Sequence, residues 1–371
     1  MAKSKRSEIK TIAISTGGGD APGLNTVIRA AVRKIKREHD WRILGIRESF
    51  EGLITGEGNV ELTEENVKGI LAKGGTVLGT SNRGNPFSYP SERGGKLVAV
   101  DLSGLVIQRM LDMKIDALML IGGDGTMRIA HRFHQLNCPV VGVPKTIDND
   151  LRATDRTFGF ETAVDIVTWA LDKLHSTAES HDRVMIVEVM GREAGWIALY
   201  SGIAGGADVI LIPEIPFSFD NVAKKIHERR AKGRDFSIVV VAEGAKMKGD
   251  EDSTLLEEGD ERFGMPRLGG IGYRVREGIE QFIGLETRVV VLGHLQRGGS
   301  PNAFDRVLAS RMGCAAVDLI AQGKFGHMAS IEGDKITSVP IAKAISGSKL
   351  VNPDGEMVKV ARALGISFGD K

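Results

Sequence analysis

The sequence lacks the features that mark secreted, membrane-spanning and nucleic-acid-binding proteins. Its two cysteines, Cys138 and Cys314, exclude a disulfide framework or a cysteine metal site and indicate a reducing compartment. No apolar run approaches the roughly 18 residues that span a bilayer, and the basic first residues contain no signal-peptide core. With 49 Lys and Arg against 48 Asp and Glu, the chain has no global field to hold nucleic acid or a membrane. We therefore expect a cytoplasmic protein with two buried thiols and with no nucleic-acid or membrane partner.

Glycine, in contrast, is abundant. The chain has 47 glycines among 371 residues, which is close to twice the usual share of about 7%. This excess predicts many tight turns and close approaches of the backbone to ligands. The length is sufficient for two domains, or for two halves around one cleft.

Short β-branched runs alternate with amphipathic stretches of helical length. The predicted strands are 9–16, 41–46, 116–121, 139–143, 184–189, 208–212, 237–242 and 288–292. The predicted helices are 25–36, 125–135, 161–174, 220–232, 267–282 and 302–321. The alternation predicts βαβ units and parallel sheets covered on both faces. One segment, 81–103, breaks it, and its Gly, Pro and Ser predict a long loop beside a site.

Two glycine-rich loops each follow a predicted strand and precede a predicted helix. In the first, residues 17–19 are three successive glycines, which let backbone N–H groups approach an anion beside a helix N-terminus. This loop alone also fits a tight turn. In the second, Asp124 stands between two glycines at the carboxyl end of a strand, where open α/β sheets bind ligands. An aspartate there repels phosphate unless a divalent cation lies between them, so the loop predicts Mg²⁺ with a phosphate donor.

A third loop follows the strand predicted at 139–143. Asp148 and Asp150 lie two residues apart on an extended segment, so they face similar directions. An acid beside a metal-phosphate site accepts a hydroxyl proton or helps to hold the metal. Paired acids after a strand also serve as helix caps or solvated turns, so the neighbouring loops carry the assignment.

Four arginines at the edges of predicted strands and loops are further candidate site residues, together with Glu243 and His294. Guanidinium groups bind phosphate bidentately, and a carboxylate such as Glu243 can accept sugar hydroxyls. Each arginine alone also fits a surface salt bridge, and His294 a structural histidine. The arginines are Arg183, Arg192, Arg288 and Arg297.

Six motifs in one order resemble those of the phosphofructokinase A family of 6-phosphofructokinases, in particular its mixed-substrate subgroup. They are GGDAPG (18–23), GGDGT (122–126), PKTIDND (144–150), MGREAG (190–195), AEG (242–244) and LGHLQRGGSP (292–301). The resemblance runs from about residue 10 to about residue 306. It implies Mg²⁺-dependent transfer of a phosphoryl group to the C1 hydroxyl of fructose 6-phosphate, a glycolytic step. It also implies a homo-oligomer, a dimer or tetramer, with shared active sites.

The resemblance implies a role for each matching residue. Asp148 corresponds to the base that takes the C1 hydroxyl proton, Thr146 lies beside it, and Arg192 is placed to stabilise the transferring charge. The acids matched to the metal are Asp124 and Asp150. The residues matched to the donor are Gly19, Arg83, Gly84, Gly123, Asp124, Gly125 and Thr126. Those matched to the sugar phosphate are Thr146, Ile147, Asp148, Met190, Gly191, Arg192, Glu243, His294, Leu295, Gln296 and Arg297, with Arg183 and Arg288 reaching it from a neighbouring subunit.

Gly125 and Lys145 bear on the choice of donor. ATP-using bacterial members of the family carry glycine at both positions, and pyrophosphate users typically carry aspartate at the first and lysine at the second. This chain combines the glycine of the ATP users with the lysine of the pyrophosphate users. An aspartate at position 125 would add bulk and negative charge where the α-phosphate of ATP must lie. We therefore expect ATP, with pyrophosphate-dependent transfer as the alternative.

Arg29 and Arg33 bear on regulation. They match basic residues that bind a phosphorylated effector in regulated bacterial relatives, although arginines one helical turn apart also fit a solvated helix face.

Other functions explain less of the sequence. A nicotinamide dehydrogenase would need a G-x-G-x-x-G fingerprint with its downstream acid, and a lipid or NAD kinase would share only GGDGT. A non-catalytic regulatory subunit would be free to lose Asp124, Asp148, Arg192 or Glu243, all of which are present.

We therefore expect an α/β fold of two similar domains, each with a parallel-dominated sheet flanked by helices, and an active site in the interdomain cleft. The donor-nucleotide and Mg²⁺ domain is predicted at 1–159 plus about 296–345. The sugar-phosphate domain is predicted at 160–295 plus about 346–371.

Overall fold

The structure is a computed structural model that describes residues 9–81, 84–249, 256–257, 267–268 and 270–371. The chain forms two compact units, and neither is continuous in sequence. Unit 1 comprises Met1–Thr146, Leu151–Gly159 and Gly298–Gly347. Unit 2 comprises Ile147–Asp150, Phe160–Arg297 and Ser348–Lys371.

Unit 1 is built on a seven-stranded sheet among the described residues. Its strands, in order across the sheet, are β15 (Lys335–Pro340), β14 (His327–Glu332), β7 (Val140–Pro144), β6 (Ala117–Gly122), β1 (Thr11–Thr16), β2 (Arg42–Ile46) and β3 (Val60–Glu61). The strands from β14 to β2 run parallel, while β15 and β3 pair antiparallel at the two edges. The parallel arrangement confirms the prediction from the alternating pattern.

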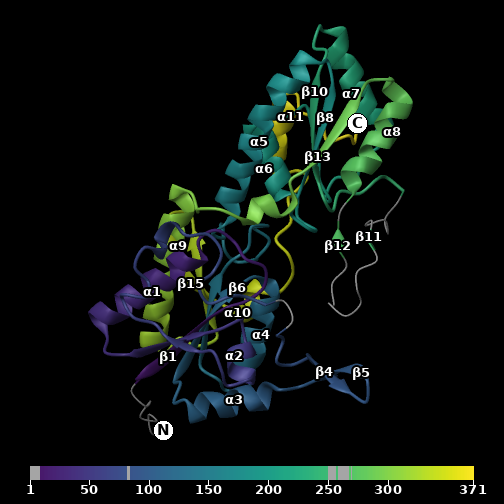
Figure 1. Ribbon diagram of the computed structural model, residues 1–371. Helices are drawn as coiled ribbons and strands as arrows, with labels where there is room; N and C mark the ends of the chain where they lie inside the picture. The colour runs from purple at the N-terminus through teal and green to yellow at the C-terminus, as the bar shows by residue number, and fades with distance from the viewer. Residues whose placement is uncertain (1–8, 82–83, 250–255, 258–266, 269) are drawn as a thin grey trace. The chain divides into compact units, whose positions relative to one another are not determined.

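Helices cover both faces of this sheet (Figure 1). One face carries α1 (Leu24–Glu38), α9 (Ala303–Ala321) and the 3₁₀ turn η1 (Ile70–Ala72), and the other carries α2 (Glu51–Ile54), α3 (Ser103–Asp112), α4 (Asp124–Gln135) and α10 (Ile341–Ala344). Along β6, Met119 and Ile121 join the core under α1 and α9, and Leu118 and Leu120 join the core under α4. Both cores are apolar, which explains why β6 reads as a continuous hydrophobic run.

The segment predicted as a long loop, 81–103, is partly regular, so that prediction was wrong. It contains an antiparallel hairpin of β4 (Tyr89–Arg93) and β5 (Lys96–Val100), which lies apart from the main sheet of unit 1 (Figure 1). Gly94 and Gly95 form the two-residue turn, with φ of 58° and 76°. A turn with positive φ at both positions matches the twist of a hairpin and favours glycine.

Unit 2 is built on a four-stranded parallel sheet among the described residues. The order is β13 (Thr287–Val291), β8 (Val184–Val189), β10 (Ser237–Ala242) and β9 (Val209–Leu211). One face carries α5 (Phe160–Ser180), α6 (Trp196–Ala204) and α11 (Glu356–Ala363), and the other α7 (Phe219–Ala231) and α8 (Ile271–Ile283) (Figure 1). The short strands β11 (Leu256–Glu257) and β12 (Arg267–Leu268) pair with each other, and the 3₁₀ turn η3 (Gly293–Arg297) follows β13.

The predicted elements are present with shifted ends. The strands predicted at 184–189 and 237–242 are confirmed to the residue, and the other six differ by at most two residues at either end. The helix predicted from 267 begins at Ile271, because 267–268 form β12. Helices α3, α6 and α11 and strands β14 and β15 were not predicted.

Both cysteines are free thiols. Cys138 is buried, which raises the pKa of its thiol to about 12. Cys314 is only half-buried, so the prediction of two buried thiols holds for Cys138 alone. In the described part of the chain, no helix has the length and apolarity needed to cross a membrane.

Candidate active site

The two glycine-rich loops lie side by side in unit 1. The chain runs from β1 outward to β2 on one side, and later from β6 to β7 on the other, so the direction of winding reverses between β1 and β6. Open α/β sheets bind ligands outside the carboxyl ends of the strands at such a reversal. The loop after β1 and the loop after β6 meet there, and Gly17 N–H donates to Ile121 O at 2.9 Å.

Thr126, on α4, packs between these loops. A Cβ would lie 2.6 Å from Thr126 Oγ1 if built on Gly17, and 2.2 Å if built on Gly122. Only glycine therefore allows the close approach of the two loops at these positions. A Cβ on Gly125 would meet no described atom within 4 Å, so the space beside position 125 is open.

Lys145 lies beneath the first glycine loop. It follows β7 in sequence, is 3% exposed, and donates from Nζ to the carbonyl oxygen of Gly19. Its Nζ would lie 3.6 Å from a Cβ built on Gly18, where φ is +76°. One positive charge therefore stands beside the backbone that was predicted to hold the donor phosphates.

Asp124 occupies the first turn of α4, with Gly123 as its N-cap. Its Oδ2 accepts from Arg128 Nε at 2.6 Å. Mg²⁺ is held by one or two carboxylates together with phosphates and waters. A single, partly exposed carboxylate beside a glycine loop fits that donor set, although the described residues contain no cluster of three or more metal-binding side chains.

Two further donor residues were predicted next to each other in sequence. Arg83 lies outside the described residues. Gly84 is buried, and a Cβ built on it would lie 3.2 Å from Glu51 Oε1. Glu51 Oε2 accepts from the Tyr89 hydroxyl at 2.9 Å.

In unit 2, one group of the predicted sugar-phosphate residues follows three adjacent strands. Residues 190–195 follow β8, Glu243 follows β10, and η3 follows β13. Because parallel strands end at the same edge of a sheet, these segments converge. Glu243 Oε1 accepts from the backbone N–H groups of Arg192 at 3.0 Å and Gly191 at 3.3 Å. These bonds hold the loop after β8 against the end of β10.

Glu243 is a perturbed carboxylate. Its pKa is raised from 4.5 to about 7, mainly by burial and also by the nearby charge of Asp148, while the backbone N–H groups of Arg192 and Gly191 and the Arg192 charge oppose the rise. Perturbed acids of this kind concentrate at functional sites.

Asp148 belongs to unit 2, although Thr146, two residues earlier, belongs to unit 1. The Asp148 side chain is 6% exposed, and its effect on the Glu243 pKa places the two carboxylates near one another. Ile147 is fully buried, so only its backbone can meet a ligand. The carbonyl oxygen of Thr146 accepts from the Thr157 hydroxyl at 2.7 Å.

Gln296 supports the site from below. It is fully buried, its Oε1 accepts from Met190 N–H at 3.2 Å, and its Nε2 donates to Gly293 O at 3.1 Å. Its amide thus holds the loop after β8, and its predicted role at the sugar phosphate stays a prediction. Its neighbours His294 and Leu295 are exposed on the same 3₁₀ turn.

Arg192 takes an unusual backbone conformation. Its φ is 52°, and its side chain is exposed. A Cβ on Gly244 would lie 1.9 Å from the Arg192 carbonyl oxygen, so glycine after Glu243 permits this turn.

Arg183 and Arg288 lie at the other end of the same sheet. Arg183 precedes β8 and Arg288 is the second residue of β13, while Glu243 and Met190 follow strand ends. A six-residue strand is about 20 Å long. Both guanidinium groups bind the Glu286 carboxylate, with Arg183 Nε at 2.7 Å, and the hydrogen bond from Arg183 lowers the Glu286 pKa most. Within one chain, these arginines are therefore separated from the rest of the predicted sugar site.

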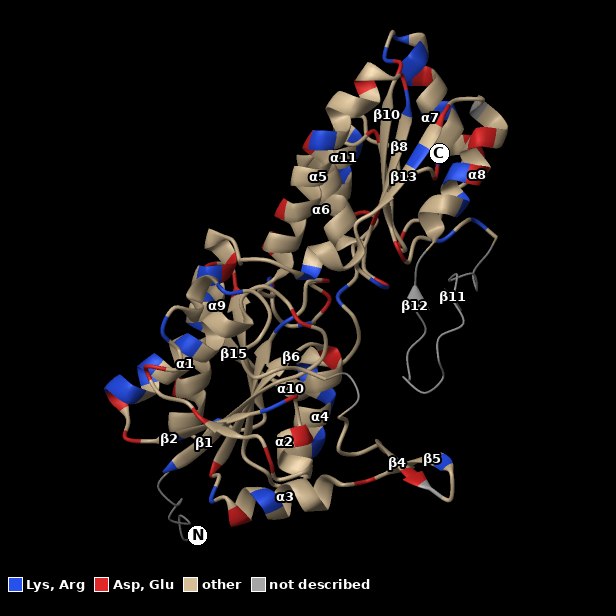
Figure 2. Cartoon of the chain, viewed as in Figure 1, with Lys and Arg blue, Asp and Glu red and all other residues tan. Residues whose placement is uncertain are grey.

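Basic residues gather along α1 (Figure 2). Arg29 and Arg33 lie one turn apart on it, and the pKa of Arg29 is lowered by partial burial and by the charge of Arg33. An effector role for this pair stays a prediction.

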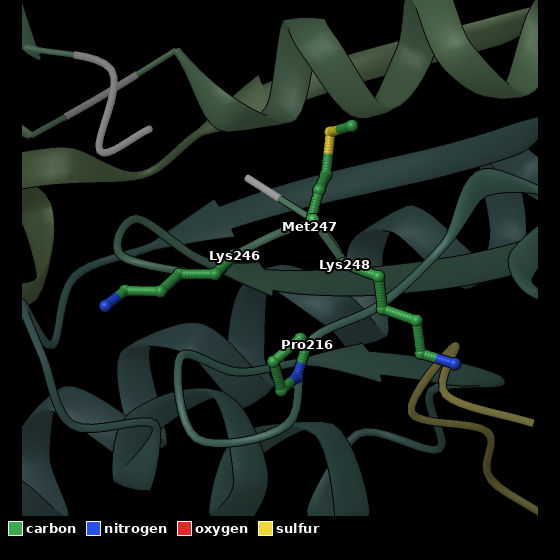
Figure 3. Close-up of a pocket in the computed structure, with 5 residues that line it drawn as sticks. Pro216, Lys246, Met247 and Lys248 are labelled. Atoms are coloured by element: carbon green, nitrogen blue, oxygen red, sulfur yellow. The ribbon is translucent and has the colours of Figure 1, made fainter. Parts of the chain in front are cut away.

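A pocket of about 480 Å³ in unit 2 involves none of the predicted residues. It is lined by Pro216, Lys246, Met247, Lys248 and Gly249. The lysine side chains extend in opposite directions (Figure 3), and Lys248 Nζ donates to Asp370 O at 2.8 Å. Since the two ammonium groups do not converge, the pocket has no built anion site.

Comparison with known proteins gives one consistent result. The family model described as Phosphofructokinase matches residues 11–320. A protein of Chloroflexus aggregans named ATP-dependent 6-phosphofructokinase is 49% identical over 365 residues, which cover 98% of this chain and 99% of that protein. The crystal structure of Pichia pastoris phosphofructokinase in the T-state superposes with a TM-score of 0.76 at 32% identity, over 98% of this chain and 37% of that longer chain. A pyrophosphate-dependent phosphofructokinase from Nitrosospira multiformis superposes with a TM-score of 0.78 over 96% of this chain and 91% of that chain, and at 22% identity it shows the fold alone.

Proposed function

The chain belongs to the phosphofructokinase family, and we propose that it transfers the γ-phosphoryl group of ATP to the C1 hydroxyl of fructose 6-phosphate, giving fructose 1,6-bisphosphate. The observation that carries this proposal is the 49% identity, over nearly the whole of both chains, to a protein named ATP-dependent 6-phosphofructokinase. The chain is thus a phosphotransferase enzyme, and pyrophosphate-dependent transfer is not favoured. Its cytoplasmic location stays a prediction.

Unit 1 is the proposed donor domain. Backbone N–H groups of the loops after β1 and β6, with the N-terminus of α4, would bind the donor phosphates. The open space beside Gly125 supports a donor as large as ATP, and Lys145 adds positive charge next to Gly19. We include Gly84, Gly123, Thr126 and Arg83 in this site from the family resemblance.

Asp124 would hold Mg²⁺, and Asp150 is matched to the metal by the family resemblance alone. The ion would neutralise charge on the donor phosphates. The proposal is supported by the partly exposed Asp124 carboxylate at the start of α4.

Unit 2 is the proposed sugar-phosphate domain, and Asp148 is the proposed base. An acceptor for the C1 hydroxyl proton must lie within hydrogen-bond reach of that hydroxyl. Phosphoryl transfer otherwise needs positioning and charge stabilisation. Arg192, whose charge lowers the Glu243 pKa, is the proposed stabilising cation. Glu243 would accept a sugar hydroxyl through Oε2, because Oε1 already accepts from two backbone N–H groups.

We also propose a homo-oligomer with shared sites. Arg183 and Arg288 lie together on Glu286, at the sheet edge opposite to Glu243. In this arrangement they would serve the sugar phosphate bound by a neighbouring subunit.

The test is a coupled assay of fructose 1,6-bisphosphate formation with Mg²⁺, supplying ATP and pyrophosphate separately at matched concentrations. We expect turnover with ATP. The Asp148→Asn variant should lose about 10²- to 10⁴-fold in kcat while keeping its affinity for fructose 6-phosphate. Turnover with pyrophosphate alone would refute the donor, and no turnover with either would refute the activity.

A further inference from the structure

A short segment in unit 2 contacts two loops of the proposed site at once. It consists of Lys349, Leu350 and Val351, and we call it the 349–351 clasp. One loop carries the proposed base, Asp148, and the other carries Arg192. All contacts of the clasp described below lie within unit 2.

The clasp binds the segment that carries Asp148. Lys349 N–H donates to Asp150 O at 2.7 Å, and Lys349 Nζ donates to Asn149 Oδ1 at 3.0 Å. Residues 147–150 belong to no helix or strand, and Asn149 is 1% exposed with a φ of 52°. The position of Asp148 therefore depends on tertiary contacts rather than on regular hydrogen bonding of its own segment.

The clasp also binds the loop that carries Arg192. Trp196, the first residue of α6, donates from Nε1 to Lys349 O at 2.7 Å, and Lys349 Nζ lies 5.9 Å from the Trp196 ring centroid. One step further along, Val351 N–H donates to Glu214 Oε1 at 2.8 Å. The same carboxylate accepts from Gly195 N–H at 3.0 Å.

Gly195 is required for this arrangement. A Cβ built on it would lie 2.4 Å from Ile212 Cβ and 2.8 Å from Glu214 Oε2. Burial raises the pKa of Glu214, and the N–H groups of Gly195 and Val351 oppose the rise. Glu214 thus joins the end of the Arg192 loop to the clasp inside a largely buried contact.

We infer that Lys349 is a positioning residue for phosphoryl transfer, which ties the Asp148 segment to the loop 190–196 through Asn149, Asp150 and Trp196. The inference rests on the proposed function. A base and a charge-stabilising group act only when both are held in one geometry, and a displacement of about 1 Å can cost about 100-fold in rate. Because the contacts described above join the Asp148 segment to the Arg192 loop, the loss of Lys349 should affect the transfer step more than donor affinity.

The test compares Lys349→Met and Lys349→Arg with the wild type in full-length protein. Lys359→Met is the matched control, since Lys359 is exposed on α11 in the same unit. We expect Lys349→Met to lose about 10- to 100-fold in kcat, with the KM for ATP within about 2-fold of the wild type. Lys349→Arg, which keeps a charged donor, should recover at least about 10-fold of that loss, and the control should match the wild type.

Trp196→Phe provides the second variant, because it removes the Nε1 donor and keeps an aromatic ring. It should lower kcat in the same way. Combining it with Lys349→Met should cost less than the product of the two single effects, because the bond to the Lys349 carbonyl and the bond from the Lys349 ammonium position the same two segments. A merely structural role would instead lower kcat in proportion to the folded fraction, which thermal unfolding measures, and would give no rescue by arginine.

The outcomes separate this inference from the proposed function. A wild type without turnover would overturn the proposed function itself. If the wild type is active and the kcat of Lys349→Met equals that of Lys359→Met, only the inferred positioning role of Lys349 would be overturned. If Lys349→Met does not fold, an unchanged kcat in Trp196→Phe overturns it.

Discussion

The raised pKa of Glu243 makes the stability of the protein depend on pH in a predictable direction. The pKa lies at about 7 in the folded chain against an ordinary value of 4.5. The folded state therefore binds an extra proton between these values. The stabilisation is fully present below about pH 4.5 and is lost as the pH rises through about 7. One pKa unit corresponds to about 1.4 kcal/mol, so ionising Glu243 costs the folded state up to about 3 kcal/mol.

Glu243→Gln removes this dependence and preserves the local geometry. The glutamine oxygen can still accept from the N–H groups of Gly191 and Arg192, and no charge is left to bury. Relative to the wild type, the variant should gain stability steadily between pH 5 and pH 8, by up to about 3 kcal/mol. Its gain should be smallest at pH 5.

The measurement is urea unfolding at pH 5, 6, 7 and 8, with the free energy of unfolding taken from the linear dependence on urea. Glu193→Gln is the matched control, because Glu193 is exposed on the loop after β8, whose backbone Glu243 binds. The control should follow the wild type at every pH. Parallel stability profiles for the wild type and Glu243→Gln would refute the argument from burial.

The same titration predicts an effect on the proposed substrate site. Protonation removes a carboxylate acceptor, so the wild-type KM for fructose 6-phosphate should rise as the pH falls below about 7. In Glu243→Gln this limb of the pH profile should be absent. A wild-type KM that stays constant from pH 8 to pH 6 would contradict the assignment of Glu243 to the sugar.

Three further substitutions test other parts of the structure. Gly125→Asp should raise the KM for ATP at least about 10-fold through charge repulsion. Thermal unfolding should not change, because a Cβ at position 125 meets no described atom within 4 Å. An unchanged KM would remove position 125 from the donor site. Gln296→Met should lower the free energy of unfolding by about 1–3 kcal/mol, since the partly buried N–H of Met190 loses its acceptor. An equally stable variant in urea would show that the bond contributes nothing. Phe368→Ala should cost about 3–5 kcal/mol, because this ring is fully buried beside the edge of β9, where Ser367 pairs with Val209; a loss below 1 kcal/mol would contradict that packing.

Local pattern predicted eight strands and six helices and missed others, such as β14, β15 and α6, for physical reasons. The strands β8 and β10 are buried on both faces, so their β-branched runs are unbroken and their ends are sharp. Helix α6 was missed because it is apolar almost all round and has no amphipathic period, being packed against both α5 and the sheet. The hairpin of β4 and β5 carried a usable signal, Gly94 and Gly95 between two short β-prone runs, which the Pro and Ser around it concealed.

The candidate site was predictable wherever one short segment carries its own chemistry. Residue type next to a strand end was enough to indicate the glycine loops, Asp124 and the Asp148 segment. Gln296 and Glu214 do not, because a buried amide or carboxylate gains its role from backbone groups elsewhere in the chain. Only the fold shows that Glu286 holds Arg183 and Arg288 together.

The sequence by itself determined the α/β class, the order of the strands along the chain and the family, because hydrophobic period and contiguous motifs are local properties. The tertiary structure decided which segments meet. Lys349 and Asn149 are 200 residues apart in sequence and form one hydrogen bond in unit 2. The direction of winding likewise reverses between β1 and β6, so two loops more than 100 residues apart lie side by side. Such contacts depend on how whole elements pack, since no local pattern encodes the partner of a side chain that lies far along the chain.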